Sequence, residues 1–265
     1  MNILYVGDVM GLYGVGTLQQ VLPEVRRKHG VDMVIVQAEN VSGGKGLSVA
    51  DYQTLRKLGV DGFTGGNHSV AKKEIFPLLS DPHVPVTGPA NMLGLPGPGY
   101  KYVETAGKKV LIVSLLGQIV GRDADKAIGN PLQTIDAILE SQKGVERTAT
   151  IVNFHGDYSS EKVVIGHYLD GRVTAVVGDH WHVPTADGRV LPAGTAHITD
   201  VGMCGALDSS LGVAYESIIP RWRDGVQTKN VLAQSGLRQF NALLVTANSQ
   251  GLADSVLAIN QTIQV

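Results

Sequence analysis

The chain has 265 residues, a length that accommodates one large domain or two small ones. Its 22 basic and 24 acidic residues give a formal net charge of −2, which argues against a general nucleic-acid clamp or a polybasic membrane binder. Hydrophobic residues make up 43% of the chain, so it can bury a sizeable core and whole-chain disorder is excluded. The single cysteine, Cys204, fits a reducing compartment. Since no apolar run approaches the roughly 18 residues of a membrane span and no basic leader precedes the first apolar run, we expect a cytoplasmic protein.

The first half of the chain alternates predicted strands with predicted helices. Apolar residues at positions 18, 21, 22 and 25 recur at helical spacing, and Gly30 ends this helix, although Pro23 removes a hydrogen-bond donor within it. A second helix begins at Ser48, with Asp51 three residues later as a variant of the capping box, and ends at Gly59. We predict strands over residues 2–7, 33–38 and 61–64 and a third helix over residues 71–79.

The second half begins with a Pro/Gly-rich loop over residues 88–99 and continues with further strands and helices. Gly107 predicts the turn of a hairpin, and Asn130-Pro131 predicts a helix start with Asn as the N-cap. We predict strands over residues 100–105, 109–115, 150–154 and 173–177, a helix over residues 159–169, and a final hairpin over residues 242–247 and 255–259.

The order of these elements indicates the fold class. No internal repeat, charge run or long linker divides the sequence, so we expect one domain over residues 1–265. The simplest architecture is an α/β fold in which two mixed β-sheets are sandwiched between helices. A three-layer, doubly wound sheet is the alternative.

Polar side chains follow the predicted strands at the points where the strands end. Ligands of open α/β sheets bind beyond the carboxyl ends of the strands, so we expect these side chains to converge at one edge. Their pooled oxygen and nitrogen atoms suit manganese, iron or zinc, whereas calcium would require oxygen alone. The residues come from five strand ends and are Asp8, Glu39, Asn40, Asn67, His68, His155, His180 and His182.

The spacing of these residues favours a pair of metal ions. On an extended chain, residues two apart project to the same side about 6.5–7 Å apart, so His180 and His182 can straddle ions separated by about 3.5–4 Å. Glu39 has two carboxylate oxygens and can bridge the pair. Neighbouring residues of an extended segment point in opposite directions, which allows Asn67 to bind metal while His68 faces the substrate.

Each of these residues also has an ordinary structural interpretation. Asp8 after Gly7 is typical of a turn or cap, Asn40 and Asn67 of turns, and His155 of a hydrogen-bonded core histidine. Their occurrence together at five strand ends favours the metal site. The remaining histidines lack this context, and we interpret them as surface or structural residues: His29, His83, His167 and His197.

Other chemistries have less support. The Gly-x-Ser-x-Gly elbow of serine hydrolases is absent, and Cys204 has no obvious base beside it, so we predict that this cysteine is a small buried residue. Residues 41–46 are Gly-rich but lack the spacing of a P-loop. We expect a flexible lid or a simple turn there, with Lys45 as a candidate substrate contact.

The same residues resemble the calcineurin-like metallophosphoesterases through Gly7-Asp8, Gly66-Asn67-His68, His155 and the Gly178-x-His180-x-His182 segment. The chain is more similar to their YmdB-like bacterial branch, in which Ala-Glu-Asn replaces the Gly-Asp of most relatives, here at residues 38–40. The similarity runs in consistent order from residue 1 to about 215. It includes the segments Gly43–Gly46, Ser160–Lys162, Leu169–Val173, Thr185–Asp187 and Ile198–Met203.

This resemblance implies a calcineurin-like phosphoesterase fold and a phosphodiesterase that hydrolyses 2′,3′-cyclic or 3′,5′-cyclic nucleotides. It implies two divalent metal ions, with iron favoured and manganese or zinc as alternatives. It implies that His68 is the general acid. One metal would be held by Asp8, Glu39, Asn40 and His182, and the other by Glu39, Asn67, His155 and His180.

The expected partner is a small phosphodiester or nucleotide substrate, with no stable nucleic-acid complex and no membrane association. The sequence leaves the oligomeric state open, a homo-oligomer included. Two other functions are alternatives to the phosphodiesterase: a phosphomonoesterase or phosphatase on the same centre, and a metal-binding regulatory protein with weak turnover.

Three departures from the family pattern surround the candidate ligands. Val70-Ala71 replaces a usual Trp-Asp pair, Gly156-Asp157 replaces a common Ala-Glu pair, and Asp179 and Trp181 replace small threonines. Every ligand position is retained, so these departures bear on the pocket wall and the substrate preference and not on metal binding.

Overall fold

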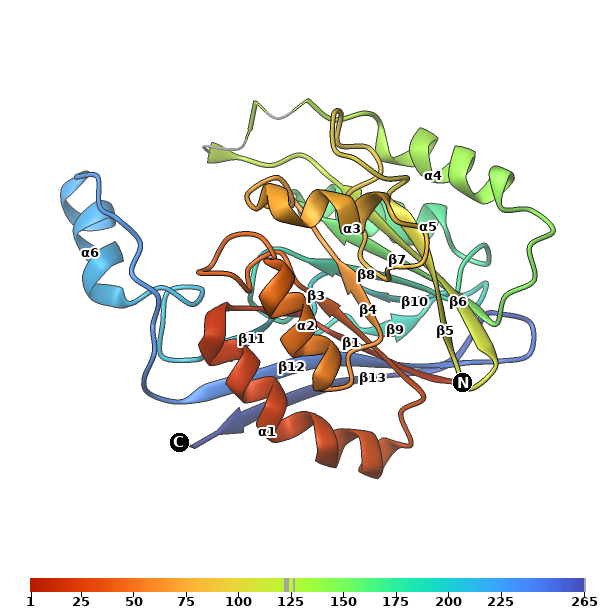
Figure 1. The fold of residues 1–265 in the computed structure, drawn as a ribbon, viewed down its shortest axis with the longest axis horizontal. Helices are drawn as coiled ribbons and strands as arrows, with labels where there is room; N and C mark the ends of the chain where they lie inside the picture. Colours follow the sequence, from red (N-terminus) through yellow and green to blue (C-terminus); the bar gives the residue numbers. More distant parts are fainter. Residues whose placement is uncertain (122–123, 126, 265) are drawn as a thin grey trace.

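The computed structural model describes residues 1–121, 124–125 and 127–264. Within these residues, two mixed β-sheets pack against each other and helices cover their outer faces (Figure 1). The first sheet has seven described strands in the order β2-β11-β12-β1-β3-β4, with β13 paired to β12. Its strands are β1 (Asn2–Val6), β2 (Asp8–Val9), β3 (Met33–Gln37), β4 (Gly62–Thr64), β11 (Met203–Ala206), β12 (Arg238–Ala247) and β13 (Ala253–Ile263).

The second sheet has six described strands in the order β5-β6-β7-β8-β10-β9. Strands β6, β7, β8 and β10 run parallel to one another, as do β1, β3 and β4 of the first sheet. The strands of the second sheet are β5 (Tyr100–Thr105), β6 (Lys108–Leu116), β7 (Ala149–His155), β8 (Ala175–Asp179), β9 (Arg189–Val190) and β10 (Ala196–Ile198).

The helices divide between the two outer faces, apart from one at the periphery. α1 (Gly11–His29) and α2 (Val49–Lys57) pack on the first sheet, followed by a short 3₁₀ turn η1 (Lys73–Ile75) and α3 (Phe76–Ser80). α4 (Pro131–Ser141) and α5 (Ser159–Tyr168) pack on the second sheet. α6 (Tyr215–Asp224) lies at the left edge of Figure 1, and its buried Ile218 belongs to a small apolar cluster with Met203 of β11. None of the helices in the described ranges has the length and hydropathy that crossing a bilayer would require.

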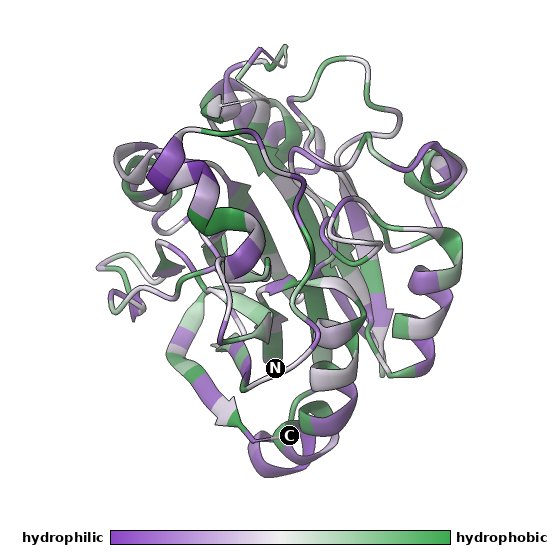
Figure 2. Cartoon of the chain, turned by 90° about the vertical axis from the view of Figure 1, so that its left-hand side faces the viewer, coloured by the Kyte–Doolittle hydropathy of each residue, from purple (hydrophilic) through white to green (hydrophobic). Residues whose placement is uncertain are grey.

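Side-chain alternation along the strands builds three cores. On β1, Ile3 and Tyr5 enter the core between the sheets, whereas Leu4 and Val6 enter the core beneath the first pair of helices. A third core joins the second sheet to α4 and α5. Because β1, β3 and β7 are buried on both faces, they consist mostly of apolar residues without polar alternation. In Figure 2 the central strands are largely apolar, and polar residues colour much of the outer helices.

This architecture confirms the predicted α/β fold with two mixed sheets between helices. The three-layer alternative is wrong, since the two sheets are distinct and enclose a core of their own. Several predicted local signals are also confirmed. Gly30 ends α1 with a left-handed φ of 56°, the Ser48 side chain accepts a hydrogen bond from the backbone N–H of Asp51, and Asn130 caps α4.

Some elements differ from the prediction. The helix predicted over residues 71–79 is a 3₁₀ turn followed by five helical residues, because Pro77 lacks a backbone donor. The strand predicted over residues 173–177 begins at Ala175 and continues to Asp179. The prediction did not include β2, β9, β10, β11 or α6; these strands have two to four residues, too few for a periodic pattern, and α6 contains Pro220.

Candidate metal centre

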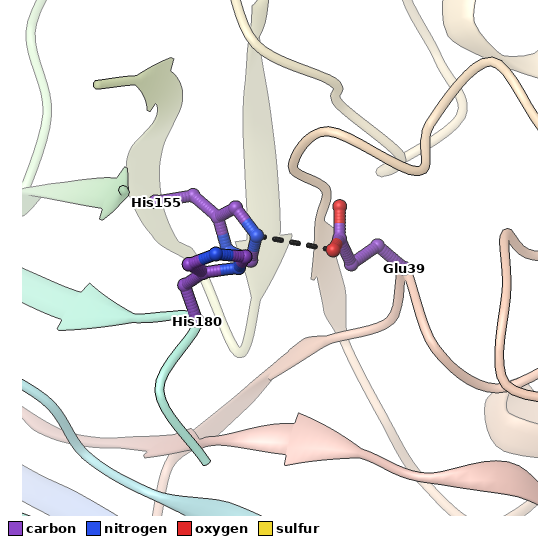
Figure 3. A group of neighbouring side chains, drawn as sticks. All are labelled: Glu39, His155 and His180. Atoms are coloured by element: carbon purple, nitrogen blue, oxygen red, sulfur yellow. Dashed lines mark ion pairs between the residues drawn. The ribbon is translucent and has the colours of Figure 1, made fainter. Parts of the chain in front are cut away.

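All eight predicted site residues lie beyond or at the carboxyl ends of strands from both sheets. Asp8 lies two residues beyond the end of β1, at the first position of β2; Glu39 and Asn40 follow β3, and Asn67 and His68 follow β4. In the second sheet, His155 ends β7, and β8 leads into His180 and His182. The side chains of Glu39, His155 and His180 point toward one another, Glu39 from the first sheet and the two histidines from the second (Figure 3).

One group of side chains surrounds the Glu39 carboxylate. The ligand atoms of Glu39, His155 and His180 all lie within 4.8 Å of one another. His155 Nε2 is 3.0 Å from Glu39 Oε1 and 2.9 Å from Asn67 Oδ1. The rings of His155 and His180 pack edge to face, with centroids 4.4 Å apart. These atoms form a candidate site for a cation.

A second group joins Asp8, Asn40 and His182. Asn40 Nδ2 lies 3.1 Å from Asp8 Oδ1 and 3.2 Å from His182 Nε2. Asp8 Oδ1 and His182 Nε2 are themselves 3.7 Å apart. In this arrangement the amide nitrogen of Asn40 faces its two neighbours, while its oxygen lies 2.9 Å from His68 Nδ1. Only the oxygen of a carboxamide binds a cation, so metal binding by Asn40 requires the opposite orientation of the amide.

Glu39 and His68 connect the two groups. The backbone N–H of His68 donates to Glu39 Oε2 at 2.9 Å, and His68 Nδ1 lies 3.4 Å from Glu39 Oε1. Gly66 allows this approach, because a Cβ there would overlap both His155 and the Glu39 carboxylate. The side chain of His68 is 19% exposed, whereas that of Glu39 is 1% exposed. His68 therefore lies at the rim of the cluster.

The electrostatics of the cluster are those of buried, mutually interacting groups. Burial alone would raise the pKa of Glu39, but the charge and hydrogen bond of His155 outweigh it and lower that pKa well below its usual range. Burial, reinforced by the charge of His180, lowers the pKa of His182 to about 4. His182 is therefore a neutral imidazole at pH 7, the form that binds metals.

The local backbone differs from the extended segments that the spacing argument assumed. Asn67 and His68 lie in a turn, so their side chains do not simply point in opposite directions. His180 and His182 have φ values of 102° and 63°, and the segment that joins them is bent. The explanation of how these residues converge was therefore wrong, although the structure does bring them together.

A buried ion pair holds this bent segment. Lys162 Nζ, on α5, donates to Asp200 Oδ2 at 2.8 Å and to the backbone oxygen of Asp179 at 2.7 Å. The same Asp200 oxygen accepts from the backbone N–H of Trp181 at 2.9 Å, and the Trp181 ring lies 4.0 Å from Lys162 Nζ. In the sequence, Lys162 stands out only as part of a segment similar to the family, because it follows Ser160 and Glu161 and looks like an ordinary polar residue of the first helical turn.

Two aspartates that the sequence marked only as departures from the family pattern also contact histidines of the site. Asp179 Oδ1 is 2.6 Å from His155 Nδ1, and Asp157 Oδ1 is 3.3 Å from His180 Nε2. For Asp179, its position at the end of an apolar strand, directly before a histidine, could have been the signal.

The residues outside the cluster match their structural interpretations. Cys204 is buried, as predicted, and burial raises the pKa of its thiol. His83 and His167 are exposed, and His197 is buried with Nδ1 3.1 Å from the backbone oxygen of Val176. The Gly-rich loop is a set of turns in which Ser42 Oγ accepts from the backbone N–H of Ser48.

The donor atoms fit a divalent cation. Glu39 Oε1 is buried with His155 Nε2 3.0 Å away, and a carboxylate oxygen so placed is costly unless positive charge lies beside it. Around it are imidazole nitrogens and a carboxamide oxygen. This combination of ligands is typical of sites for first-row divalent metals.

Comparisons with known proteins show the family to which the chain belongs. The YmdB-like protein family matches residues 4–259. A Bacillus subtilis (strain 168) protein named 2′,3′-cyclic-nucleotide 2′-phosphodiesterase is 40% identical over 253 residues, which cover 94% of this chain and 92% of that protein. A crystal structure described as a novel phosphatase from Mycoplasma pneumoniae superposes with a TM-score of 0.89 at 30% identity, covering 99% of this chain and 93% of that one.

A further solved structure, a hypothetical protein from Thermus thermophilus, has a TM-score of 0.88 at 35% identity and covers 99% of both chains. These similarities extend over nearly the whole chain and include every strand that leads into the candidate metal centre. The chain therefore belongs to the YmdB-like protein family.

Proposed function

We propose that this protein is a metal-dependent phosphodiesterase that hydrolyses cyclic nucleotides. The observation that carries the proposal is the convergence of carboxylate, carboxamide and imidazole groups from both sheets around the buried Glu39 carboxylate. The name of the B. subtilis relative supports a 2′,3′-cyclic nucleotide as the first substrate to test, with 3′,5′-cyclic nucleotides second.

Two divalent cations would be held by the two groups of side chains. Asp8, Asn40 and His182 would hold one ion, Asn67, His155 and His180 the other, and Glu39 would contribute to both. When bound, the cations would supply positive charge to the phosphoryl oxygens and acidify the attacking water. Iron is the first metal to test, with manganese and zinc as alternatives.

His68 would supply the proton that hydrolysis requires. Water adds to phosphorus, one phosphorus–oxygen ester bond breaks, and the departing oxygen takes up a proton. His68 lies at the partly exposed rim, and its backbone N–H is fixed by Glu39. Because its Nδ1 is directed at Asn40, Nε2 is the ring atom that would deliver the proton. A histidine is suited to this task near neutral pH.

Lys45 stays a candidate for contact with the substrate. Its side chain is exposed on the Gly-rich loop, which follows Glu39 and Asn40 directly in the chain. A cation there could approach a negatively charged phosphoryl group without taking part in the proton transfer.

A substrate panel tests the proposal. Purified protein loaded with Fe²⁺ or Mn²⁺ is assayed with 2′,3′-cyclic AMP, 3′,5′-cyclic AMP, a chromogenic diester and the matching chromogenic monoester. We expect hydrolysis of at least one cyclic nucleotide, a preference for the diester over the monoester, and loss of activity with a chelator.

Two other results would favour the alternatives. Hydrolysis of the monoester alone would identify a phosphomonoesterase on the same centre. Tight metal binding without turnover of any ester would favour a regulatory protein, an alternative that the bulky Trp181 beside His180 and His182 keeps open.

A further inference from the structure

His155 is enclosed by protein on both of its ring nitrogens. Nε2 faces Glu39 and Asn67, and Nδ1 lies 2.6 Å from Asp179 Oδ1 on the opposite side. The side chains of His155 and Asp179 have no solvent exposure. The ring orientation is therefore set by protein contacts rather than by water.

Three donors determine which Asp179 oxygen is available to His155. Tyr5 Oη donates to Oδ2 at 2.8 Å, Asn153 Nδ2 donates at 2.6 Å, and Gln37 Nε2 donates at 3.2 Å. These donors come from β1, β7 and β3, which are fixed in the two sheets. Oδ2 is thereby occupied, and Oδ1 is left as the acceptor for a proton on His155 Nδ1.

We propose that Asp179 is a positioning residue that fixes the orientation and the tautomer of His155 at the metal centre. With one proton held on Nδ1 by Asp179, Nε2 would be the ring atom that presents a lone pair to a cation lying beside Glu39 and Asn67. A histidine that binds a metal usually donates its other ring N–H to such a partner, which also strengthens its basicity. The inference rests on the proposed metal centre and adds to it a residue that does not contact the cation.

His180 and Asp157 provide an internal comparison. Their separation is longer, 3.3 Å, and their side chains are 20% and 23% exposed. Asp157 Oδ2 accepts the backbone N–H of Val120 at 2.7 Å, so a loop rather than the sheets positions this carboxylate. We therefore expect Asp157→Asn to weaken metal binding less than the matching change at Asp179.

The isosteric substitution Asp179→Asn reverses the hydrogen bond. Three donors still face the position of Oδ2, so the amide oxygen must occupy it and the amide NH₂ must face His155. His155 Nδ1 then becomes an acceptor, and the ring proton moves to Nε2, the atom that faces Glu39. A protonated Nε2 cannot bind a cation.

The test measures two quantities: which ring nitrogen of His155 carries the proton, and how tightly the protein binds a metal ion. Nitrogen-15 NMR of histidine-labelled protein locates the His155 proton in the metal-free and zinc-loaded forms, and equilibrium dialysis measures Mn²⁺ binding. We expect a proton on Nδ1 of the wild-type protein in both forms. In D179N we expect Nδ1 to lose its proton and Mn²⁺ affinity to fall about 10- to 100-fold.

Tyr5→Phe is the matched control, since it disturbs the same buried network while leaving the Asp179 carboxylate in place. We expect this variant to keep the wild-type tautomer and Mn²⁺ affinity. A wild-type Nδ1 without a proton, unchanged Mn²⁺ affinity in D179N, or an equal loss in Y5F would overturn the inference. If D179N does not fold, the wild-type spectrum still tests the inference, because it shows whether His155 Nδ1 carries a proton.

Failure of the proposed function gives a different result. A wild-type protein that binds no Mn²⁺, Fe²⁺ or Zn²⁺ would defeat the metal centre itself. The position of the His155 proton in the metal-free protein would still report separately whether Asp179 controls the ring.

Discussion

Lys162 and Asp200 form an ion pair in which neither side chain has solvent exposure, with Nζ and Oδ2 2.8 Å apart. Removing one partner of such a pair leaves an uncompensated buried charge, which typically costs about 3–5 kcal/mol. We therefore expect Lys162→Met to lower the free energy of unfolding by about that amount, measured by urea denaturation.

The exposed pair Lys143–Glu140 offers a control for this prediction. Its side chains are 77% and 76% exposed, and solvent-exposed pairs contribute little to stability. Lys143→Met should leave the denaturation midpoint unchanged. Equal midpoints for K162M and the wild-type protein would show that the buried pair does not stabilise the fold.

The sequence allowed the position of the site to be predicted, because the carboxyl ends of parallel strands meet at one edge whatever the details of the loops. Asp8, Glu39 and His155 could be predicted as candidates simply by finding apolar strands that are followed by polar residues. The same alternation of strands and helices favoured two sheets between helices but left a single doubly wound sheet as an alternative.

The backbone around the site could not be predicted from spacing. The left-handed φ values of His180 and His182 are rare for residues other than glycine. The bent segment that contains them is held by Lys162 and Asp200, which lie 38 residues apart in the chain. A propensity or periodicity argument describes neighbouring residues, so it does not detect such a contact. The same reason explains why Asp179, whose partners come from three other strands, was noted only as a departure.

Glu39 is the one carboxylate proposed to serve both cations, so its loss should affect both. We expect Glu39→Ala to lose both metals, as measured by elemental analysis of protein purified with Fe²⁺ or Mn²⁺. Asp61→Ala removes a carboxylate that pairs instead with Arg26 at the opposite, amino end of β4, and it serves as the control. Retention of both ions by E39A would reject the bridging role.

His68 is proposed to donate a proton without holding a metal. His68→Ala should therefore keep a metal content near that of the wild-type protein while kcat falls by about 10²–10⁴. His83→Ala, at an exposed histidine outside the cluster, should change neither quantity. Loss of metal from H68A would identify His68 as a ligand instead of an acid.

His197 gives the fold a pH dependence that is independent of the metal centre. Burial lowers the pKa of His197 in the folded protein, and its Nε2 is buried without a hydrogen-bond partner in the described part of the chain. The unfolded chain, in which a histidine has a pKa of about 6.5, therefore takes up this proton at a higher pH than the folded protein does. The contribution of His197 to stability is therefore fully present above the unfolded-state pKa of about 6.5. It is lost as the pH falls from there toward the lower pKa of His197 in the folded protein.

Asparagine at position 197 can donate to the Val176 carbonyl in place of Nδ1 but does not titrate. We expect the free energy of unfolding of the wild-type protein, relative to His197→Asn, to decrease between pH 7.5 and pH 5.5. Urea denaturation at several pH values in this interval measures the difference. A difference that stays constant, or that grows in favour of the wild-type protein as the pH falls, would contradict the burial of a neutral His197, because only a group that resists protonation in the folded state produces the expected sign.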